Sequence, residues 1–121
     1  MAKRLSMLLL LPLFQTAFAA DLPAVGQVWE QARQNPEGAF SGIIATTGTV
    51  TGTEISRYLT PVVQISDRTG GRLLANCVLP RSHSPKLSSY KAGDKVRIEG
   101  RYHGFFSNAV VMKNCAVAKT Q

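Results

Sequence analysis

The chain has 121 residues, and 14 Lys and Arg against 7 Asp and Glu give it a formal charge of +7. A hydrophobic content of 45% excludes a disordered charged tail, and the length allows about one domain. The two cysteines are too few for a disulfide-rich scaffold or a four-thiolate zinc site.

The first residues predict a secretory signal peptide. Lys3 and Arg4 form a basic start, residues 5–14 are almost continuously apolar, and Ala17 and Ala19 place small residues before a cleavage site. A retained anchor is the alternative, but the apolar run is shorter than the roughly 20 residues of a spanning helix. We therefore expect cleavage after residue 19 and secretion across the inner membrane into the periplasm. No integral membrane segment would remain, and no cysteine follows the cut to accept a lipid.

One amphipathic helix is predicted after the cleavage site. Residues 21–23 are suitable helix-start residues, and Asn35 before Pro36 predicts the end, because a residue before proline avoids the helical region. An apolar stripe at helical spacing comprises Val25, Val28, Trp29 and Ala32. We expect Trp29 to anchor this helix on the rest of the protein rather than to serve as a ligand platform.

From Phe40 onward the apolar pattern alternates with a period of two and predicts five strands. A short helical turn within residues 81–90 separates the third strand from the fourth, which is the element order of an OB-fold barrel. We therefore expect a signal peptide at 1–19, an N-terminal helical segment at 20–38 and an OB-fold domain at 39–121. The predicted strands are 43–50, 59–66, 72–79, 95–101 and 108–117, with turns at 52–58, 67–71 and 92–94 and a tip at 102–107.

The two cysteines, Cys77 and Cys115, lie on the third and fifth predicted strands. In an oxidising compartment an isolated pair is most simply one disulfide, and these two strands are neighbours in an OB-fold. A zinc site with His83 and His103 is the weaker alternative, because no pair has short metal-ligand spacing. A redox-active thiol would need a C-x-x-C motif, which the sequence lacks. We expect no metal and no cofactor.

A resemblance to a known family is carried by four segments: Asn35-Pro36-Glu37, Thr47-Gly48-Thr49-Val50, the strand with Cys77, and residues 90–100 leading to Asn114-Cys115-Ala116-Val117. The chain between 35 and 117 is similar to the exported bacterial OB-fold proteins called tRNA-anticodon-like domains, with a looser likeness to another small periplasmic OB-fold family. The resemblance implies the barrel, implies no tRNA binding and supplies no catalytic residues.

The predicted ligand site lies in the loops of the barrel. OB-folds bind ligands on strands two and three and on the loops that join strands 1–2 and 4–5. Aromatic rings beside cations suit stacking on a base or sugar, although the same rings can instead close the end of the barrel. The candidates are Arg57 and Tyr58 in the 1–2 loop and Arg101, Tyr102, His103, Phe105 and Phe106 in the 4–5 loop.

Basic residues also share one face of the fourth strand. Lys95, Arg97 and Arg101 alternate with Val96 and Ile98, so the three cations form a stripe. Such a stripe can attract an anionic polymer, or it can be an ordinary solvated outer face.

The sequence favours binding over catalysis. The carboxylates are scattered, the histidines lack a nucleophile partner, and Gly70-Gly71 is not followed by the Lys-Ser/Thr of a phosphate loop. We therefore expect an envelope accessory protein that binds a glycan, an anionic polymer or an envelope protein. The alternatives are a nucleic-acid-binding protein, for instance in DNA transfer across the envelope, and an assembly subunit that uses a sheet edge.

Overall fold

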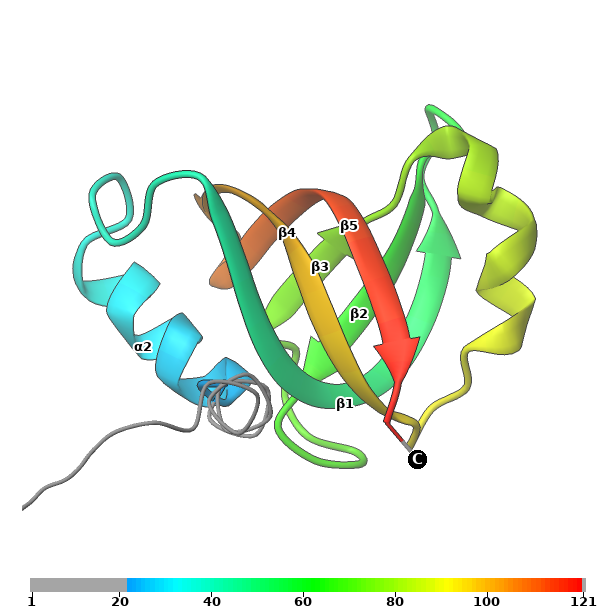
Figure 1. Cartoon of the computed structure of the whole chain (residues 1–121), viewed down its shortest axis with the longest axis horizontal. Coiled ribbons are helices and arrows are strands. Elements are labelled where there is room, and N and C mark those ends of the chain that lie inside the picture. The colour runs from blue at the N-terminus through cyan, green and yellow to red at the C-terminus, as the bar shows by residue number, and fades with distance from the viewer. Residues whose placement is uncertain (1–21, 121) are drawn as a thin grey trace, which may run out of the picture.

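Five strands close into a barrel in the order β1-β2-β3-β5-β4, with β1 paired to β4 (Figure 1). This computed structural model describes residues 22–120, so the predicted signal peptide lies outside the described residues. The strands are β1 (Ile43–Ile55), β2 (Pro61–Ser66), β3 (Ala75–Val78), β4 (Lys95–Phe106) and β5 (Ala109–Lys119), and the helices are α2 (Val25–Gln34) and the 3-10 helix η1 (Arg81–Ser89).

The strand pairing confirms the predicted fold class. All neighbouring strands are antiparallel except β3 and β5, which are parallel, and η1 connects β3 to β4. A closed five-stranded barrel with this order and a helix between the third and fourth strands is OB-fold-like.

Strand β1 is longer than predicted, because it pairs with two partners in turn. Its first half pairs with β4 and its second half with β2, and a bulge between Val50 and Gly52 lets the strand bend between them (Figure 1). The prediction of a turn at 52–58 was therefore wrong for residues 52–55. Gly48 sits in the bend where a Cβ would lie 2.4 Å from Ile65 Cγ2, so only glycine fits this close approach.

The remaining strand ends differ from the prediction for local reasons. Leu59 has φ of +62°, which belongs to a turn, so β2 begins at Pro61. Strand β3 is confined to Ala75–Val78. Strand β4 continues to Phe106, so most of the predicted 4–5 loop is strand. The actual turn is Ser107-Asn108, whose φ values of +53° and +66° suit a two-residue hairpin.

Helix α2 packs one face on the barrel and ends where the sequence predicted. Val25, Val28 and Ala32 are buried, and Asn35 caps the last turn. The helix begins later than the predicted 21–23, because Pro23 and the following residue run beside β1. The carbonyl oxygen of Pro23 accepts hydrogen bonds from Thr47 N–H at 3.2 Å and Thr46 Oγ1 at 2.6 Å.

The barrel interior is filled by side chains that alternate inward along the strands, chiefly aliphatic residues of β2, β4 and β5. Helix η1 contributes the buried Leu87 at the other side of the barrel from α2 (Figure 1). Within residues 22–120, no helix has the length and apolarity needed to cross a bilayer.

The predicted disulfide is confirmed. Cys77 on β3 and Cys115 on β5 are bonded, with their Cα atoms 5.7 Å apart, and both side chains are buried. The bond crosses the parallel β3–β5 seam, which has only three paired positions. It therefore covalently joins the pairing that closes the barrel between segments distant in sequence.

Cys77→Ala with Cys115→Ala should lower the free energy of unfolding by about 4 kcal/mol, because it removes the restriction on a 38-residue loop in the unfolded chain. Urea denaturation with and without reductant measures this. Reductant should destabilise the wild-type protein and leave the double variant unchanged. Equal stability of the oxidised wild type and the double variant would contradict the prediction.

Candidate functional site

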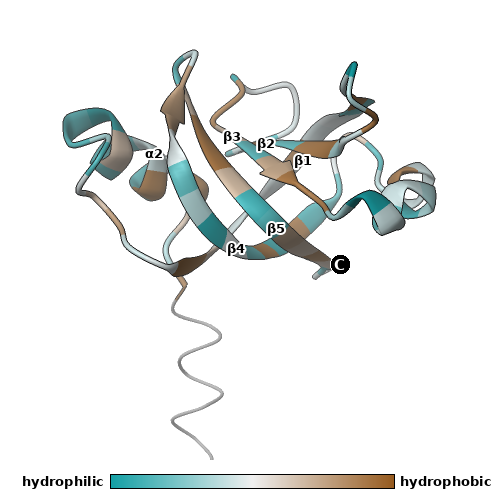
Figure 2. Cartoon of the chain, turned by 90° about the horizontal axis from the view of Figure 1, so that it is seen from above, coloured by the Kyte–Doolittle hydropathy of each residue, from teal (hydrophilic) through white to brown (hydrophobic). Residues whose placement is uncertain are grey.

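A row of cations lies on the outer face of β4. Lys95, Arg97 and Arg101 are exposed and alternate with buried Val96 and Ile98. Figure 2 shows this strand as a run of hydrophilic bands across the front of the barrel. The sequence prediction of a basic stripe is therefore correct in its geometry, whereas its function as a ligand contact stays a prediction.

One cation of this face was missed by sequence reasoning. Lys113 on β5 is the cross-strand partner of Arg101, and both side chains are exposed. Cross-strand partners share a face of the sheet, and two like charges placed there repel each other unless an anion lies between them. The sequence shows Lys113 on a strand, but two register shifts in the β4–β5 pairing decide what it faces. We define Lys95, Arg97, Arg101 and Lys113 as the basic face.

Few carboxylates offset the basic face. Glu99 lies between Arg97 and Arg101 on the same side of β4, and its oxygen is 3.9 Å from Arg97, the loosest of the ion pairs found within residues 22–120. Asp94, just before β4, accepts a hydrogen bond from Lys91 N–H at 2.9 Å, which lowers the pKa of its carboxyl below the usual value. Lys119, 3.4 Å away, pairs with this carboxylate, so Asp94 does not neutralise the basic face.

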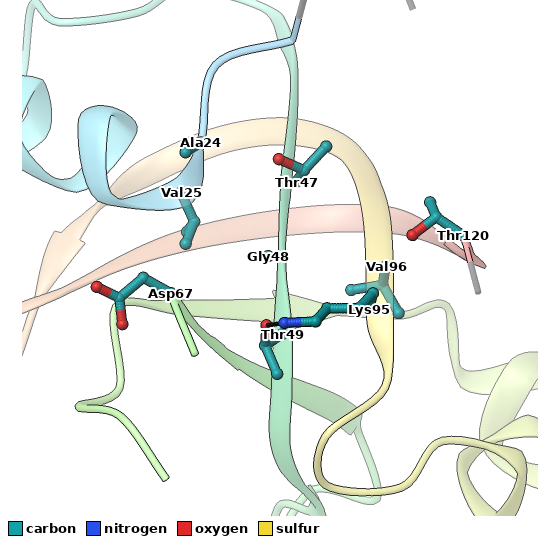
Figure 3. Close-up of a pocket in the computed structure, with 9 residues that line it drawn as sticks. All are labelled: Ala24, Val25, Thr47, Gly48, Thr49, Asp67, Lys95, Val96 and Thr120. Carbon is teal, nitrogen blue, oxygen red and sulfur yellow. Dashed lines mark hydrogen bonds between the residues drawn. The ribbon is translucent and has the colours of Figure 1, made fainter. Parts of the chain in front are cut away.

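A hollow of about 350 Å³ lies at one end of the basic face, beside the start of α2. Lys95 reaches across β1 there, and its Nζ donates to Thr49 Oγ1 at 3.4 Å (Figure 3). Asp67 lines the opposite side of the same hollow and opposes the binding of an anion in it. The charge distribution therefore favours anion contacts along the strand face rather than inside the hollow.

Two of the predicted ligand aromatics pack against the N-terminal segment. Phe105 meets Trp29 of α2 edge-on, with ring centroids 6.0 Å apart, and Tyr102 meets Phe40 in the same way at 5.1 Å. The Tyr102 hydroxyl donates to the carbonyl oxygen of Pro36. Burial raises the pKa of Tyr102, so its hydroxyl keeps the proton that it donates. These contacts fit the reading in which the rings close the end of the barrel.

Trp29 anchors α2 as predicted. Its Nε1–H donates to the carbonyl oxygen of Asn108 in the β4–β5 turn at 2.9 Å. The guanidinium of Arg72, before β3, lies over the indole ring, with its carbon 4.5 Å from the ring centroid. One side chain thus ties α2 to the β4–β5 turn and to the segment before β3.

His103 and Phe106 remain at the surface. Their rings are 5.7 Å apart and tilted, and Phe106 is 54% exposed. Gly104, with φ of +153°, lies between them, and a Cβ there would come within 2.6 Å of the Phe106 ring. Glycine therefore lets the Phe106 ring fold back over the strand beside His103, directly beyond Arg101.

The predicted pair Arg57 and Tyr58 lies elsewhere, in the loop between β1 and β2. Both are exposed, and the Arg57 guanidinium is 5.9 Å from the Tyr58 ring centroid. In Figure 1 this loop lies toward η1, whereas α2 covers the other side of the barrel. Among the described residues, no hydrogen bond, ring contact or ion pair joins this pair to the aromatics of β4.

The surface of β2 and β3, where OB-folds commonly bind ligands, carries no cation on either strand. Gln64 and Asn76 face each other there. No group of three His, Cys, Asp or Glu side chains within residues 22–120 is placed to hold a metal ion. The outer face of β4 therefore carries positive charge, whereas β2 and β3 carry none.

Phe105→Ala should lower the free energy of unfolding by about 2 kcal/mol, because it removes the edge contact with Trp29 and leaves a gap beneath α2. Phe106→Ala is the matched control and should cost less than about 0.5 kcal/mol, because that ring is exposed. Thermal and urea denaturation measure both. If both variants lose the same free energy of unfolding, Phe105 does not pack more closely than Phe106, and the prediction is wrong.

No protein-family model and no curated protein matches the chain, so the comparisons assign no family. Among solved structures, the barrel is similar to a protein from Klebsiella pneumoniae described as a "putative nucleic acid-binding lipoprotein". The match has a TM-score of 0.65 and 19% sequence identity, and covers 86% of this chain and 97% of the other. At this identity the likeness shows a shared OB-like fold.

Proposed function

We propose that this chain is a nucleic-acid-binding module that holds a single strand along the basic face of β4. The observation that carries the proposal is the alignment of cations and rings along that face. Lys95, Arg97 and Arg101 are exposed on one side of β4 with Glu99 the one carboxylate among them, Lys113 lies beside Arg101, and the exposed rings of His103 and Phe106 come next. Phosphates would lie along the cations, and a base would stack at the aromatic end.

The geometry favours this function over glycan binding through stacked aromatics. Tyr102 and Phe105 are engaged with Phe40 and Trp29, so a sugar could use them only by displacing these contacts. The cations are exposed and need no rearrangement. An anionic polymer is thus better suited to the site than a neutral sugar, and the printed description of the Klebsiella pneumoniae protein supports nucleic acid among such polymers.

A single strand suits the site better than a duplex. Base stacking on Phe106 requires an unpaired base, whereas a duplex presents its phosphates and hides the faces of its bases. The cations from Lys95 to Arg101 span about 20 Å along β4, so three or four phosphate contacts are available. Binding would be weak and strongly dependent on salt.

An envelope location supports the choice among biological settings. The disulfide favours an oxidising compartment, and the structurally similar Klebsiella pneumoniae protein is described as a lipoprotein. Together with the predicted signal peptide, these features favour a periplasmic protein that meets nucleic acid during transfer across the envelope. The proposal assigns no catalytic step, no cofactor and no metal to the chain.

The first test measures how the affinity for an oligothymidylate depends on salt concentration. Fluorescence anisotropy of the labelled oligonucleotide reports the binding. Three or four phosphate contacts predict that the logarithm of the association constant falls with the logarithm of salt concentration with a slope of about −2 to −3. A duplex of equal length should bind more weakly. Tighter binding to lipopolysaccharide than to oligothymidylate at equal phosphate concentration would instead favour an anionic envelope polymer.

Arg97→Gln with Arg101→Gln should weaken binding and reduce the magnitude of this slope by about 1.4, because two phosphate contacts are lost. Arg33→Gln with Arg68→Gln is the matched control. It removes the same two charges from the surface, but from cations that lie outside the basic face and are paired with Glu30 and Asp67. If both double variants change the slope equally, only net charge matters and the basic face is not a site.

A further inference from the structure

A second surface, separate from the basic face, stands out at the end of β1 and in the loop between β1 and β2. Most of the exposed large hydrophobic side chains found within residues 22–120 gather there. Ile55, Tyr58 and Leu59 are 51%, 68% and 69% exposed. We call these three side chains the apolar tip. Single exposed apolar residues are common, whereas several within five residues of one another are typical of an interaction site.

The backbone of the tip is strained at one of these apolar residues. Leu59 has φ of +62°, a conformation that glycine or asparagine adopts readily and a bulky side chain does not. Folding alone would favour glycine at this position. The chain instead places a large apolar side chain in a strained conformation and turns it toward solvent. Strain retained at an exposed residue points to a function for its side chain.

Hydrogen bonds within the loop satisfy most of its N–H groups. Ser56 organises the turn: its N–H donates to Thr60 O at 2.9 Å, and its carbonyl oxygen accepts from Leu59 N–H at 2.8 Å. The Ser56 hydroxyl oxygen accepts from the N–H groups of Tyr58 and Thr60, each at 3.2 Å. Most of the loop's N–H groups therefore do not need water, which lowers the cost of moving them from water into the polar interface of a bilayer.

Positive charge surrounds the tip. Arg57 lies within it, with its guanidinium 5.9 Å from the Tyr58 ring centroid. Leu79 N–H donates to Pro61 O at 2.9 Å, which brings the start of η1, with Arg81, next to the base of the loop. Lys86 follows on η1, which has no acidic residue, and Glu54 is the one nearby carboxylate on β1.

We propose that the apolar tip is a membrane-docking element that inserts into the interface of a bilayer containing anionic lipids. Ile55 and Leu59 would enter the boundary of the acyl chains, and Tyr58 would lie at the level of the headgroups, where amphipathic aromatic rings are favoured. Arg57, Arg81 and Lys86 would meet lipid phosphates. The two surfaces use different residues, so the protein can hold a bilayer with its tip and a nucleic acid with β4.

The element is too small for permanent attachment. Three side chains and a few cations give weak, reversible binding that depends on anionic lipid. Peripheral docking would thus hold the protein reversibly at the membrane surface.

Flotation of the purified protein with phosphatidylcholine vesicles, with and without phosphatidylglycerol, tests the proposal. The wild type should float with the vesicles that contain phosphatidylglycerol and bind much less to phosphatidylcholine alone. Tyr58→Ser with Leu59→Gly should reduce the apparent vesicle affinity by about tenfold or more. Leu59→Gly alone should also raise the melting temperature, because it relieves the strain at this residue.

The matched control is Ile43→Ser, which removes an exposed apolar side chain from another surface and should leave vesicle binding unchanged. Oligothymidylate affinity should be the same in the tip variant and the wild type, so failure here is distinguishable from failure of the nucleic-acid proposal. Three outcomes would overturn membrane docking. They are no vesicle binding by the wild type, equal binding by the tip variant, or a tip variant that alters only self-association, which would make the tip a contact with a second copy.

Discussion

Closure of the barrel is the constraint on which the other features depend. Strand β1 must pair with β4 and then with β2, and this is achieved by the bulge after Val50 and by the close approach at Gly48. The circle is completed by the short parallel seam of β3 and β5, which the disulfide joins covalently. Once the barrel is closed, every strand has an inside and an outside, and each alternate residue is assigned to one of them.

The inward and outward positions separate the charged side chains of β4 from its aromatic rings. On β4 the small and aliphatic residues turn inward, so Lys95, Arg97 and Arg101 must turn outward. At the far end of the strand, α2 covers part of the barrel. There Trp29 packs against Phe105 and donates a hydrogen bond to the β4–β5 turn. The aromatic residues are therefore divided between packing and surface, and the outer face of β4 carries a row of cations that Glu99 alone interrupts.

The two proposed surfaces differ in physical character as well as in place. The basic face is a regular strand surface whose side chains are held by the sheet, and it attracts phosphate by charge. The apolar tip is an internally bonded loop whose exposed leucine is strained. The fold tolerates such a loop because the backbone hydrogen bonds of the loop form within residues 56–60 and do not depend on the core.

The sequence by itself determined the helix with its Trp29 anchor, the five strands in order, the outward stripe on β4 and the cysteine pair, because each follows from local periodicity or from fold-level strand neighbours. It misplaced the end of β1 and the β4–β5 turn, since pairing with a distant strand extends a segment beyond its local turn signals. Only the tertiary structure decided that Tyr102 and Phe105 meet Phe40 and Trp29, that Lys113 faces Arg101, and that Leu59 is strained. These depend on strand register, helix docking and backbone torsion, which residue spacing along one chain does not specify.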